Sequence, residues 1–292
     1  MQLQKKLASG EFVVLAEMEP PKGSDVSGLV ANAVKVKGKV DAFVVPEMSN
    51  AVMKMSSLGG ALLLQSKGLE TVMQVCCRDR NRLALQGDLL AAQALGVANV
   101  MAVSGEDITY GDHHKAKAVN DLDLLELLGA IKTLESGKDM AGVELKGAPQ
   151  FLVGSTVKVG GSSEALDQEL AEVDKRIAAG VRFFVTSPIF DPAVLENFMQ
   201  RFSGRQAEIL TTVMLLKSVG MARYINRHLA QQTQIPEKYI SRIQNAPERV
   251  RECVQIAGEL VAALKDGGFS GVVISPIGWE DKISGILAAA GV

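Results

Sequence analysis

The feature that most constrains the fold of this chain is the regular recurrence of short apolar segments along its length. Each segment is followed by a stretch with helical periodicity, and the unit repeats about every 30 residues, the size of a βαβ repeat. The eight expected strands are residues 12–16, 42–45, 71–75, 99–103, 151–156, 183–186, 209–213 and 272–274. Eight strands that alternate with helices predict an α/β fold, a (β/α)8 TIM barrel.

The expected helices lie between these strands, with additional ones after the seventh. They are residues 26–36, 53–66, 121–134, 166–179, 192–202, 220–229, 238–244 and 247–265. An open, doubly wound sheet is the alternative, but it favours a glycine-rich dinucleotide turn after the first strand. This chain has Glu-Met-Glu-Pro-Pro-Lys-Gly there, and it contains no linker, so residues 1–292 are expected to form a single domain.

The stretch CCRDRNRLALQGDLLAAQALGVANVMAVSGED, residues 76–107, shows the repeat most clearly. A polar loop leads into a helix whose Leu85, Leu89, Leu90 and Ala94 have the spacing of one buried face. Gly96 is expected to end the helix, and the strand that follows opens into a charged loop. Two charged loops are thus expected side by side at the carboxyl end of the barrel, where such folds carry out their chemistry.

Composition excludes several classes of function. The 292 residues are 47% hydrophobic with a net charge of −2, so neither disorder nor a nucleic-acid groove is expected. No apolar run approaches the length of a membrane span, and MQLQKKLASGEF lacks the apolar core of a signal peptide, which favours a cytoplasmic protein. The three cysteines show no paired metal-binding spacing and are expected to be reduced.

Polar residues gather where the expected strands end. In chain order they are Glu17, Glu19, Glu47, Gln74, Arg78, Glu106, Asp107, Thr156, Lys158, Thr186, Ser187, Thr211, Thr212 and Ser275. A barrel mouth rich in carboxylates, with some basic and hydroxyl groups, suits a polar or charged ligand.

Glu17 is the sharpest candidate for a catalytic residue. It ends an apolar strand and is followed by Pro20 and Pro21, which restrict the backbone at the strand exit. Burial above an apolar core would raise the pKa of its carboxyl group and make it a general acid near neutral pH. The residues alone leave open the alternative that Glu17 pairs with a nearby lysine or arginine.

Other polar groups also allow two interpretations. Glu106 and Asp107 form either an anionic ligand site or a turn that starts a loop, and the residues alone favour the turn. His113 and His114 lack the spacing of a metal motif, so no metal site is expected. Arg176 either reaches a phosphate at the barrel mouth or lies on a solvated helix face.

Four segments together resemble the methylenetetrahydrofolate reductase family, in its short bacterial form that consists of the catalytic domain alone. They are LAEMEPPKG (15–23), CRDRNRLALQGDLLAAQALGVANVMAVSGED (77–107), YGDHHKAKAVNDLDLLELL (110–128) and DKRIAAGVRFFVTSPIFD (174–191). The resemblance implies a barrel that binds FAD and reduces 5,10-methylenetetrahydrofolate to 5-methyltetrahydrofolate with hydride from flavin N5. It also implies a place in one-carbon metabolism and methionine biosynthesis.

The resemblance further implies roles for individual residues. Glu17 falls on the family's general acid and Glu106 on its conserved aspartate, and both would contact folate together with Ser187. The implied flavin contacts are Gln74, Ser104, Gly105, Asn120, Asp121, Thr156, Lys158 and Arg176.

The chain departs from the family pattern at several of these positions. Ser187 replaces a glutamine that contacts folate, Glu106 replaces an aspartate, and Val219 lies near the place of an aromatic residue that stacks on NADH or folate. Electrons are therefore expected from NAD(P)H or from a partner electron-transfer subunit, and a homo- or hetero-oligomer is expected. The alternative function is a non-catalytic flavin-binding or scaffold subunit of an electron-transfer complex.

Overall fold

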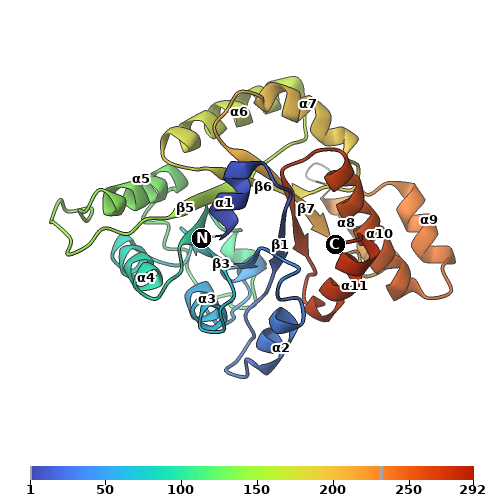
Figure 1. The fold of residues 1–292 in the computed structure, drawn as a ribbon, viewed down its shortest axis with the longest axis horizontal. Helices are drawn as coiled ribbons and strands as arrows, with labels where there is room; N and C mark the ends of the chain where they lie inside the picture. The colour runs from blue at the N-terminus through green and yellow to red at the C-terminus, as the bar shows by residue number, and fades with distance from the viewer. Residues whose placement is uncertain (1, 230–232) are drawn as a thin grey trace.

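Eight parallel strands close into a barrel in chain order within residues 2–229 and 233–292, the part of the chain that the structure, a computed structural model, describes (Figure 1). They are β1 (Val13–Glu17), β2 (Ala42–Val45), β3 (Thr71–Cys76), β4 (Asn99–Val103), β5 (Leu152–Val157), β6 (Phe183–Pro188), β7 (Glu208–Met214) and β8 (Gly271–Ser275). β1 pairs with both β2 and β8, which closes the sheet. The predicted (β/α)8 barrel is confirmed, and the predicted strands match the observed ones closely.

Side chains alternate between the two faces of the barrel wall. On β1, Val13 and Leu15 belong to the cluster inside the barrel, whereas Val14 and Ala16 belong to the cluster beneath the helices. Because successive residues of a strand point to opposite faces, Glu17 continues the inward-facing series of Val13 and Leu15. The register of the strands therefore places this carboxylate at the mouth of the barrel, above an apolar interior.

Helices surround the barrel (Figure 1). They are α1 (Gln2–Ser9), α2 (Ser27–Lys35), α3 (Ser57–Gln65), α4 (Arg82–Ala94), α5 (Leu124–Glu135), α6 (Ser163–Ala178), α7 (Ala193–Phe202), α8 (Val219–His228), α9 (Glu237–Asn245), α10 (Arg249–Asp266) and α11 (Ile283–Ala289). All the predicted helices are present, although α3 and α5 begin later than expected because the preceding loops are longer. No helix in the described ranges has the length and apolar character needed to cross a bilayer.

The sequence did not predict α1, which lies across the centre of the barrel in Figure 1. Its Leu3 and Leu7 are buried in the interior cluster. The Glu70 carboxylate, just before β3, accepts hydrogen bonds from the backbone N–H groups of Gln2 and Leu3. An acidic side chain at a helix N-terminus satisfies donors that lack helical partners. Helix α1 thus covers the end of the barrel opposite the strand carboxyl ends.

Local capping explains where α4 begins and ends. The Asn81 side chain accepts a hydrogen bond from Ala84 N, which caps the first turn. Gly96 has a φ of 92° just past the helix, as predicted for its stop. One expectation for this helix is wrong, because Ala94 is exposed. Gln86, which was not expected on the buried face, is buried. Gln86 can be buried because its amide bonds Arg82 O and Met140 N.

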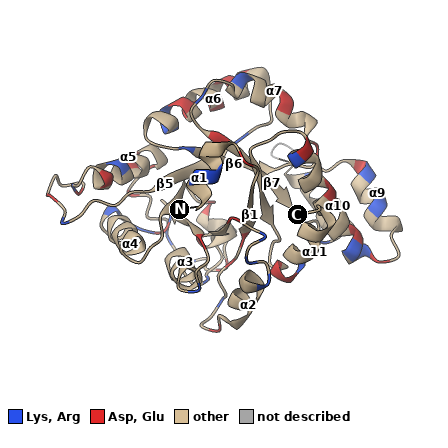
Figure 2. Cartoon of the chain, viewed as in Figure 1, with Lys and Arg blue, Asp and Glu red and all other residues tan. Residues whose placement is uncertain are grey.

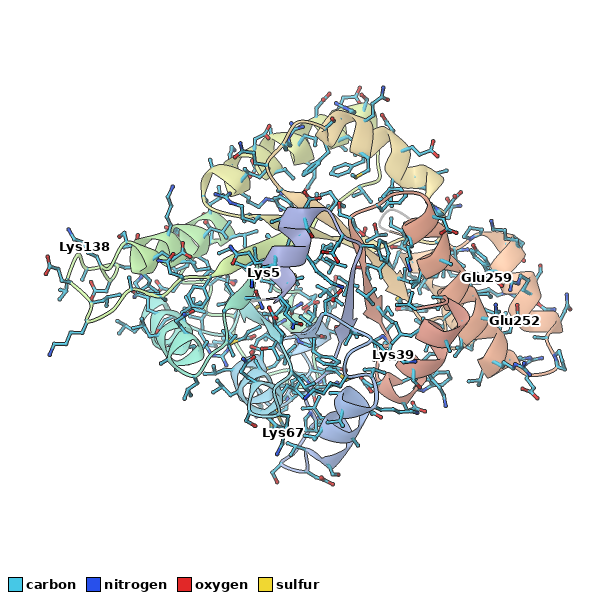
Figure 3. All side chains as sticks on the ribbon, viewed as in Figure 1. Lys5, Lys39, Lys67, Lys138, Glu252 and Glu259 are labelled. Atoms are coloured by element: carbon cyan, nitrogen blue, oxygen red, sulfur yellow. The ribbon has the colours of Figure 1, made fainter. Side chains whose placement is uncertain are left out.

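Charged residues of both signs are interspersed over the helices (Figure 2). Some of them join helices, as α9 and α10 illustrate. Glu252 and Glu259, labelled on α10 in Figure 3, both form ion pairs with Arg242 of α9. These bonds hold α9 against α10.

Candidate functional site

A cavity of about 850 Å³ opens at the carboxyl ends of β3 to β6. Of the site residues expected from the sequence, those that line it are Gln74, Ser104, Gly105, Glu106, Thr156, Lys158, Arg176 and Ser187. Glu17, Asn120 and Asp121 do not line this cavity. The structure therefore brings together most of the expected ligand contacts, which come from the ends of four strands and from α6.

Glu17 lies at the seam between β1 and β8, close enough to Glu106 of the cavity lining for the charge of Glu106 to act on it. Ser275 donates a hydrogen bond to Glu17 Oε2. Burial raises the pKa of the Glu17 carboxyl group to about 7, the hydrogen bond from Ser275 opposes this rise, and the charges of Glu19, Glu280 and Glu106 add to it. Glu17 can therefore hold or release a proton near neutral pH. It pairs with a serine hydroxyl, where the sequence had left open a pairing with a cation.

Glu106 and Asp107 are adjacent but have separate environments. Asp107 accepts hydrogen bonds from the backbone N–H and the hydroxyl of Thr109, and these bonds lower the pKa of its carboxyl group. This is the turn that the residues alone favoured. Glu106 instead lines the cavity, where its Oε2 lies 3.2 Å from Arg78 Nη1 and its side chain is 49% exposed. Only Glu106 of the two is thus placed to contact a ligand in the cavity.

Gln74 presents donors to the cavity. Its Oε1 accepts a hydrogen bond from Glu47 N at 3.2 Å, so the amide oxygen is already occupied. The Gln74 backbone oxygen accepts a bond from Ser57 Oγ at 2.7 Å, which ties β3 to the start of α3. The amide N–H groups are consequently the part of Gln74 that remains for a ligand.

The end of β5 supplies a cation to the cavity. Thr156 and Lys158 are both exposed and line the cavity, whereas Val157 between them is buried. The alternation of the strand thus continues beyond its last residue. Across residues 2–229 and 233–292, Lys158 has no carboxylate within ion-pair distance, so its ammonium group is available to an anionic ligand.

Arg176 is held within the cavity wall. Its guanidinium group donates to Thr156 O at 2.5 Å, Glu169 Oε1 at 2.7 Å and Glu172 O at 3.1 Å, and it lies over the Phe184 ring. The side chain is buried, so of the two interpretations the solvated helix face is excluded. Arg176 borders the cavity with most of its donors engaged by protein acceptors.

Asn120 and Asp121 have other surroundings. Asp121 Oδ2 accepts bonds from Arg82 N and Nε at the start of α4, which lowers the pKa of its carboxyl group. Asn120 is exposed with a φ of 42°. These two residues therefore shape the loop between β4 and α5 and lie outside the cavity lining.

The histidines and cysteines of the described residues form no metal-binding group. No group of three or more histidine, cysteine or acidic side chains in the described part of the chain is arranged to hold a metal ion. His113 bonds Asp112 at 2.8 Å on the surface. Cys76, Cys77 and Cys253 are unpaired and buried, and burial raises the pKa of each thiol.

Sequence reasoning did not assign a role to Arg78, Ser275 or Glu47. Arg78 is 2% exposed and reaches Glu106, and Ser275 reaches Glu17. Glu47 is also buried, and its carboxylate accepts a bond from Ser57 N and pairs with Arg80. All three stand at strand ends, which was the available signal, but their partners come from other strands.

The family model described as methylenetetrahydrofolate reductase matches residues 2–291. A search of curated protein sequences found no match.

Several solved structures share the barrel. An uncharacterized protein from Clostridium thermocellum, which binds two copies of 5-methyl-5,6,7,8-tetrahydrofolic acid, superposes with a TM-score of 0.68 at 14% identity, over 99% of this chain and 98% of that one. The EDTA monooxygenase EmoA from Chelativorans sp. BNC1 has a TM-score of 0.55 at 12% identity, over 96% and 94% of the two chains. A 2,3-dimethylmalate lyase has a TM-score of 0.53 at 11% identity, over 99% and 83%. At such low identities these likenesses show a common fold.

Proposed function

Because the chain belongs to the methylenetetrahydrofolate reductase family, we propose that it reduces 5,10-methylenetetrahydrofolate to 5-methyltetrahydrofolate, with FAD as its cofactor. The observation that carries the proposal is Glu17, an inward-facing carboxyl group at the end of β1 whose pKa is raised to about 7 by burial. The proposal takes residues 1–292 as one domain, since the strands that close the barrel are drawn from residues 13–275.

The cavity lining is chemically suited to a flavin. Besides the Glu106 carboxylate, the groups available there include hydrogen-bond donors and a cation, namely the Gln74 amide N–H groups, the Ser104 and Thr156 hydroxyls and the Lys158 ammonium. The carbonyl oxygens and ring nitrogens of an isoalloxazine accept hydrogen bonds, and a pyrophosphate is anionic. Lys158 suits the pyrophosphate better than Arg176, whose donors are largely engaged.

Gly105 is required by the packing of the cavity wall. Its φ is 87°, and a Cβ at this position would lie 2.5 Å from Cys76 Sγ and 2.9 Å from Arg78 Cβ. Only glycine avoids both the contact and the strain, so it allows the turn after β4 to pack against Cys76 and Arg78 at the edge of the cavity. The bound flavin would supply hydride from its N5 to the one-carbon unit of the folate.

Folate as the substrate is supported by the family and by the Clostridium thermocellum neighbour, whose description names a tetrahydrofolate ligand. In this chain Glu17, Glu106 and Ser187 would contact it. Glu17 would donate the proton that opens the five-membered ring of the substrate, which makes the one-carbon unit electrophilic. Glu106 would stabilise positive charge on the opened substrate, and the surrounding apolar strands would limit access of water.

The supply of electrons forms part of the proposal. The donor would be NAD(P)H or a partner electron-transfer subunit, and the protein would act in the cytoplasm as a homo- or hetero-oligomer. If purified protein rapidly oxidises NADH in the presence of a quinone acceptor, a partner subunit is not required.

The decisive experiment is the visible absorption spectrum of the purified protein, followed by anaerobic addition of 5-methyltetrahydrofolate. We expect flavin bands that bleach as the folate transfers its electrons. Flavin bands that do not respond would favour the alternative of a non-catalytic flavin-binding or scaffold subunit. A colourless protein that cannot be reconstituted with FAD would contradict the proposal.

Substitution of Glu17 tests its role within that reaction. E17Q is expected to lower the rate of folate-dependent bleaching by about 10²-fold or more, with flavin binding unchanged. Glu208 offers a matched control, because its Oε2 also accepts a serine hydroxyl, that of Ser270, at the opposite end of the barrel. E208Q should therefore bleach at the wild-type rate. Equal rates for E17Q and wild type would remove Glu17 from the mechanism.

A further inference from the structure

Arg78 is the most extensively bonded side chain near the cavity, and it is 2% exposed. A guanidinium group has five N–H donors, and Arg78 makes five hydrogen bonds. Nε and Nη2 donate to the two carboxylate oxygens of Asp79, each at 2.7 Å. Nη1 donates to the backbone oxygen of Glu106 at 3.4 Å and to its Oε2 at 3.2 Å, and Nη2 also donates to Met48 O at 3.1 Å.

These bonds join three loops at the mouth of the barrel. Arg78 follows β3, Met48 follows β2 and Glu106 follows β4. The backbone oxygen of Arg78 also accepts a bond at 2.7 Å from Val119 N, which lies further along the loop after β4. One side chain thus links the segments on both sides of its own strand.

The loop that Arg78 binds through Met48 has an unusual backbone. Met48, Asn50 and Ala51 have φ values of 45°, 54° and 56°. Residues other than glycine adopt this left-handed region at a cost, and such conformations persist where surrounding contacts hold them. The bond from Arg78 to Met48 O is one such contact.

A second contact comes from the loop after β4. A Cβ at Gly111 would lie 2.0 Å from Ala51 O, so the two backbones approach closely. Asp112 Oδ1 accepts a bond from Met53 N at 3.1 Å. The loops after β2 and β4 are therefore docked on each other, and Arg78 lies beneath their junction.

The partners of Arg78 leave the Glu106 carboxylate directed toward the cavity. Asp79 already provides a bidentate partner for the buried cation, so Arg78 does not depend on Glu106 for neutralisation. Glu106 is bonded through one oxygen of its carboxylate and is half-exposed toward the cavity. The second oxygen is then available to a ligand.

We infer that Arg78 is a positioning residue that directs the Glu106 carboxylate into the cavity, offsets its charge and holds the left-handed Met48–Ala51 segment beside it. This inference deepens the proposed function and rests on it for the role of Glu106 in folate reduction. The physical reason is that a planar guanidinium fork can bind three loops in one geometry, which the ammonium group of a lysine cannot reproduce.

Glu17 provides a readout that a purely structural role would not move. The groups that act on Glu17 are Ser275, Glu19, Glu280 and Glu106, and Lys54 pairs with Glu19. The negative charge of Glu106 raises the pKa of Glu17. The positive charge of Arg78, which pairs with Glu106, acts in the opposite direction. Loss of the Arg78 charge should therefore raise the pKa of Glu17, whereas loss of the Asp79 charge should lower it.

The experiment compares R78K, R78M and D79N in two assays on the full-length protein. The first assay is the pH profile of folate-dependent bleaching, which runs the reduction in reverse, so Glu17 acts as a base and the rate falls as Glu17 gains its proton. The second is the titration of Glu17 by ¹³C NMR of carboxyl-labelled glutamate, with E17Q identifying the signal. The titration needs neither folate nor flavin, so it tests Arg78 even if the proposed reaction fails.

For R78M we expect the pKa of Glu17 to rise by roughly half a unit, and for D79N we expect this pKa to fall. R78K retains the charge, so the titration should stay in place while the rate falls by about 10²-fold through misplacement of Glu106. Arg205 serves as the matched control, because it forms a similar bidentate pair with Asp174 away from the cavity. R205M should leave both readouts unchanged.

Two results would overturn the inference. One is a wild-type rate in R78K together with an unmoved Glu17 titration in D79N. The other is a rate that falls equally at every pH in R78M with no change in the titration, since that pattern marks a general loss of structure. If R78M does not fold, R78K, with its lower rate and unmoved titration, and D79N, with its lowered pKa of Glu17, still decide the question. If wild type does not react with folate, the proposed function fails while the titration still tests Arg78.

Discussion

The hydroxyl of Ser275 donates a hydrogen bond to Glu17 Oε2 across the seam that closes the barrel. The parallel register of β1 and β8 pairs Ala16 with Ile274, so the next residue on each strand lies at the same level. Both side chains point inward at the mouth. The candidate acid is thus held by the last strand of the barrel, although it lies on the first.

Removal of this hydroxyl should make Glu17 a weaker acid. The bond stabilises the carboxylate form and opposes the rise in pKa caused by burial. In S275A we expect the pKa of Glu17 to move above its value of about 7, by about one unit, the size expected for a bond to a charged group. The basic limb of the pH profile for folate reduction should shift upward accordingly. A profile that coincides with that of wild type would exclude this coupling.

Glu17 should also destabilise the folded protein at alkaline pH. Its pKa is raised from 4.5 to about 7 on folding, so the folded state binds the proton more tightly than the unfolded state. Stability is therefore lost as pH rises through this window and is unaffected below about pH 4.5. E17Q should exceed wild type in free energy of unfolding by up to roughly 3 kcal/mol at pH 8. Urea unfolding at pH 8 and pH 4 measures the difference, which should vanish at the lower pH.

Glu106 acts on Glu17 through its charge, so its neutralisation should make Glu17 a stronger acid. The carboxylate of Glu106 is one of three that raise the pKa of Glu17. In E106Q the pKa of Glu17 should fall and the basic limb of the pH profile should move to lower pH. Glu172 is a suitable control, because it also borders the cavity but is not among the groups that shift Glu17. A limb that moves equally in E172Q would mean that the effect is not specific to Glu106.

A methyl group at Gly105 should disturb the cavity wall. Gly105 and Gly204 have nearly the same φ, 87° and 86°, but only Gly105 has atoms that a Cβ would meet, with Cys76 Sγ at 2.5 Å. G204A should cost about 1–2 kcal/mol of stability through backbone strain alone. G105A should cost about 1–3 kcal/mol more through overpacking, and it should weaken flavin binding. Thermal unfolding of both variants separates the two contributions, and equal losses would contradict the contact.

The Lys158 ammonium should contribute to ligand binding and little to stability. Its side chain is exposed in the cavity and has no ion-pair partner in the described residues. K158Q should therefore weaken FAD binding while the unfolding midpoint stays within the small range typical of surface substitutions. Fluorescence titration of flavin measures the affinity, and K175Q, which removes an exposed lysine paired with Glu172 on α6, is the control. Unaltered affinity in K158Q would remove Lys158 from the site.

Much of the fold follows from local patterns that a sequence displays. The strands are buried apolar runs, and their boundaries agree with the structure to within about two residues because most runs end near polar residues, glycine or proline. Helix α1 was missed because QLQKKLAS has only Leu3 and Leu7 as apolar anchors. Its formation depends on the barrel interior that receives these leucines and on Glu70, which is 68 residues away from Gln2 in sequence.

The candidate site likewise combines features that the sequence displays with features that depend on the fold. The sequence itself placed Glu17 at the end of an apolar strand, and it showed that Gln74, Thr156 and Lys158 lie at the ends of strands that share one end of the barrel. It also showed the charged residues 76–107, whose helix and strand form a repeat with local periodicity. These are properties of neighbours in the chain, which periodicity and strand position report directly.

Only the tertiary structure decided which of these groups meet. Ser275 lies 258 residues from Glu17 and becomes its partner because the barrel closes. Arg78 donates hydrogen bonds to Met48 and Glu106 because three loops converge at this point. Asp121 lies outside the cavity lining, where it accepts a hydrogen bond from Arg82. Hydrogen bonds and pKa shifts depend on distance and burial in three dimensions, so the protonation of Glu17 is a property of the closed barrel that no single segment contains.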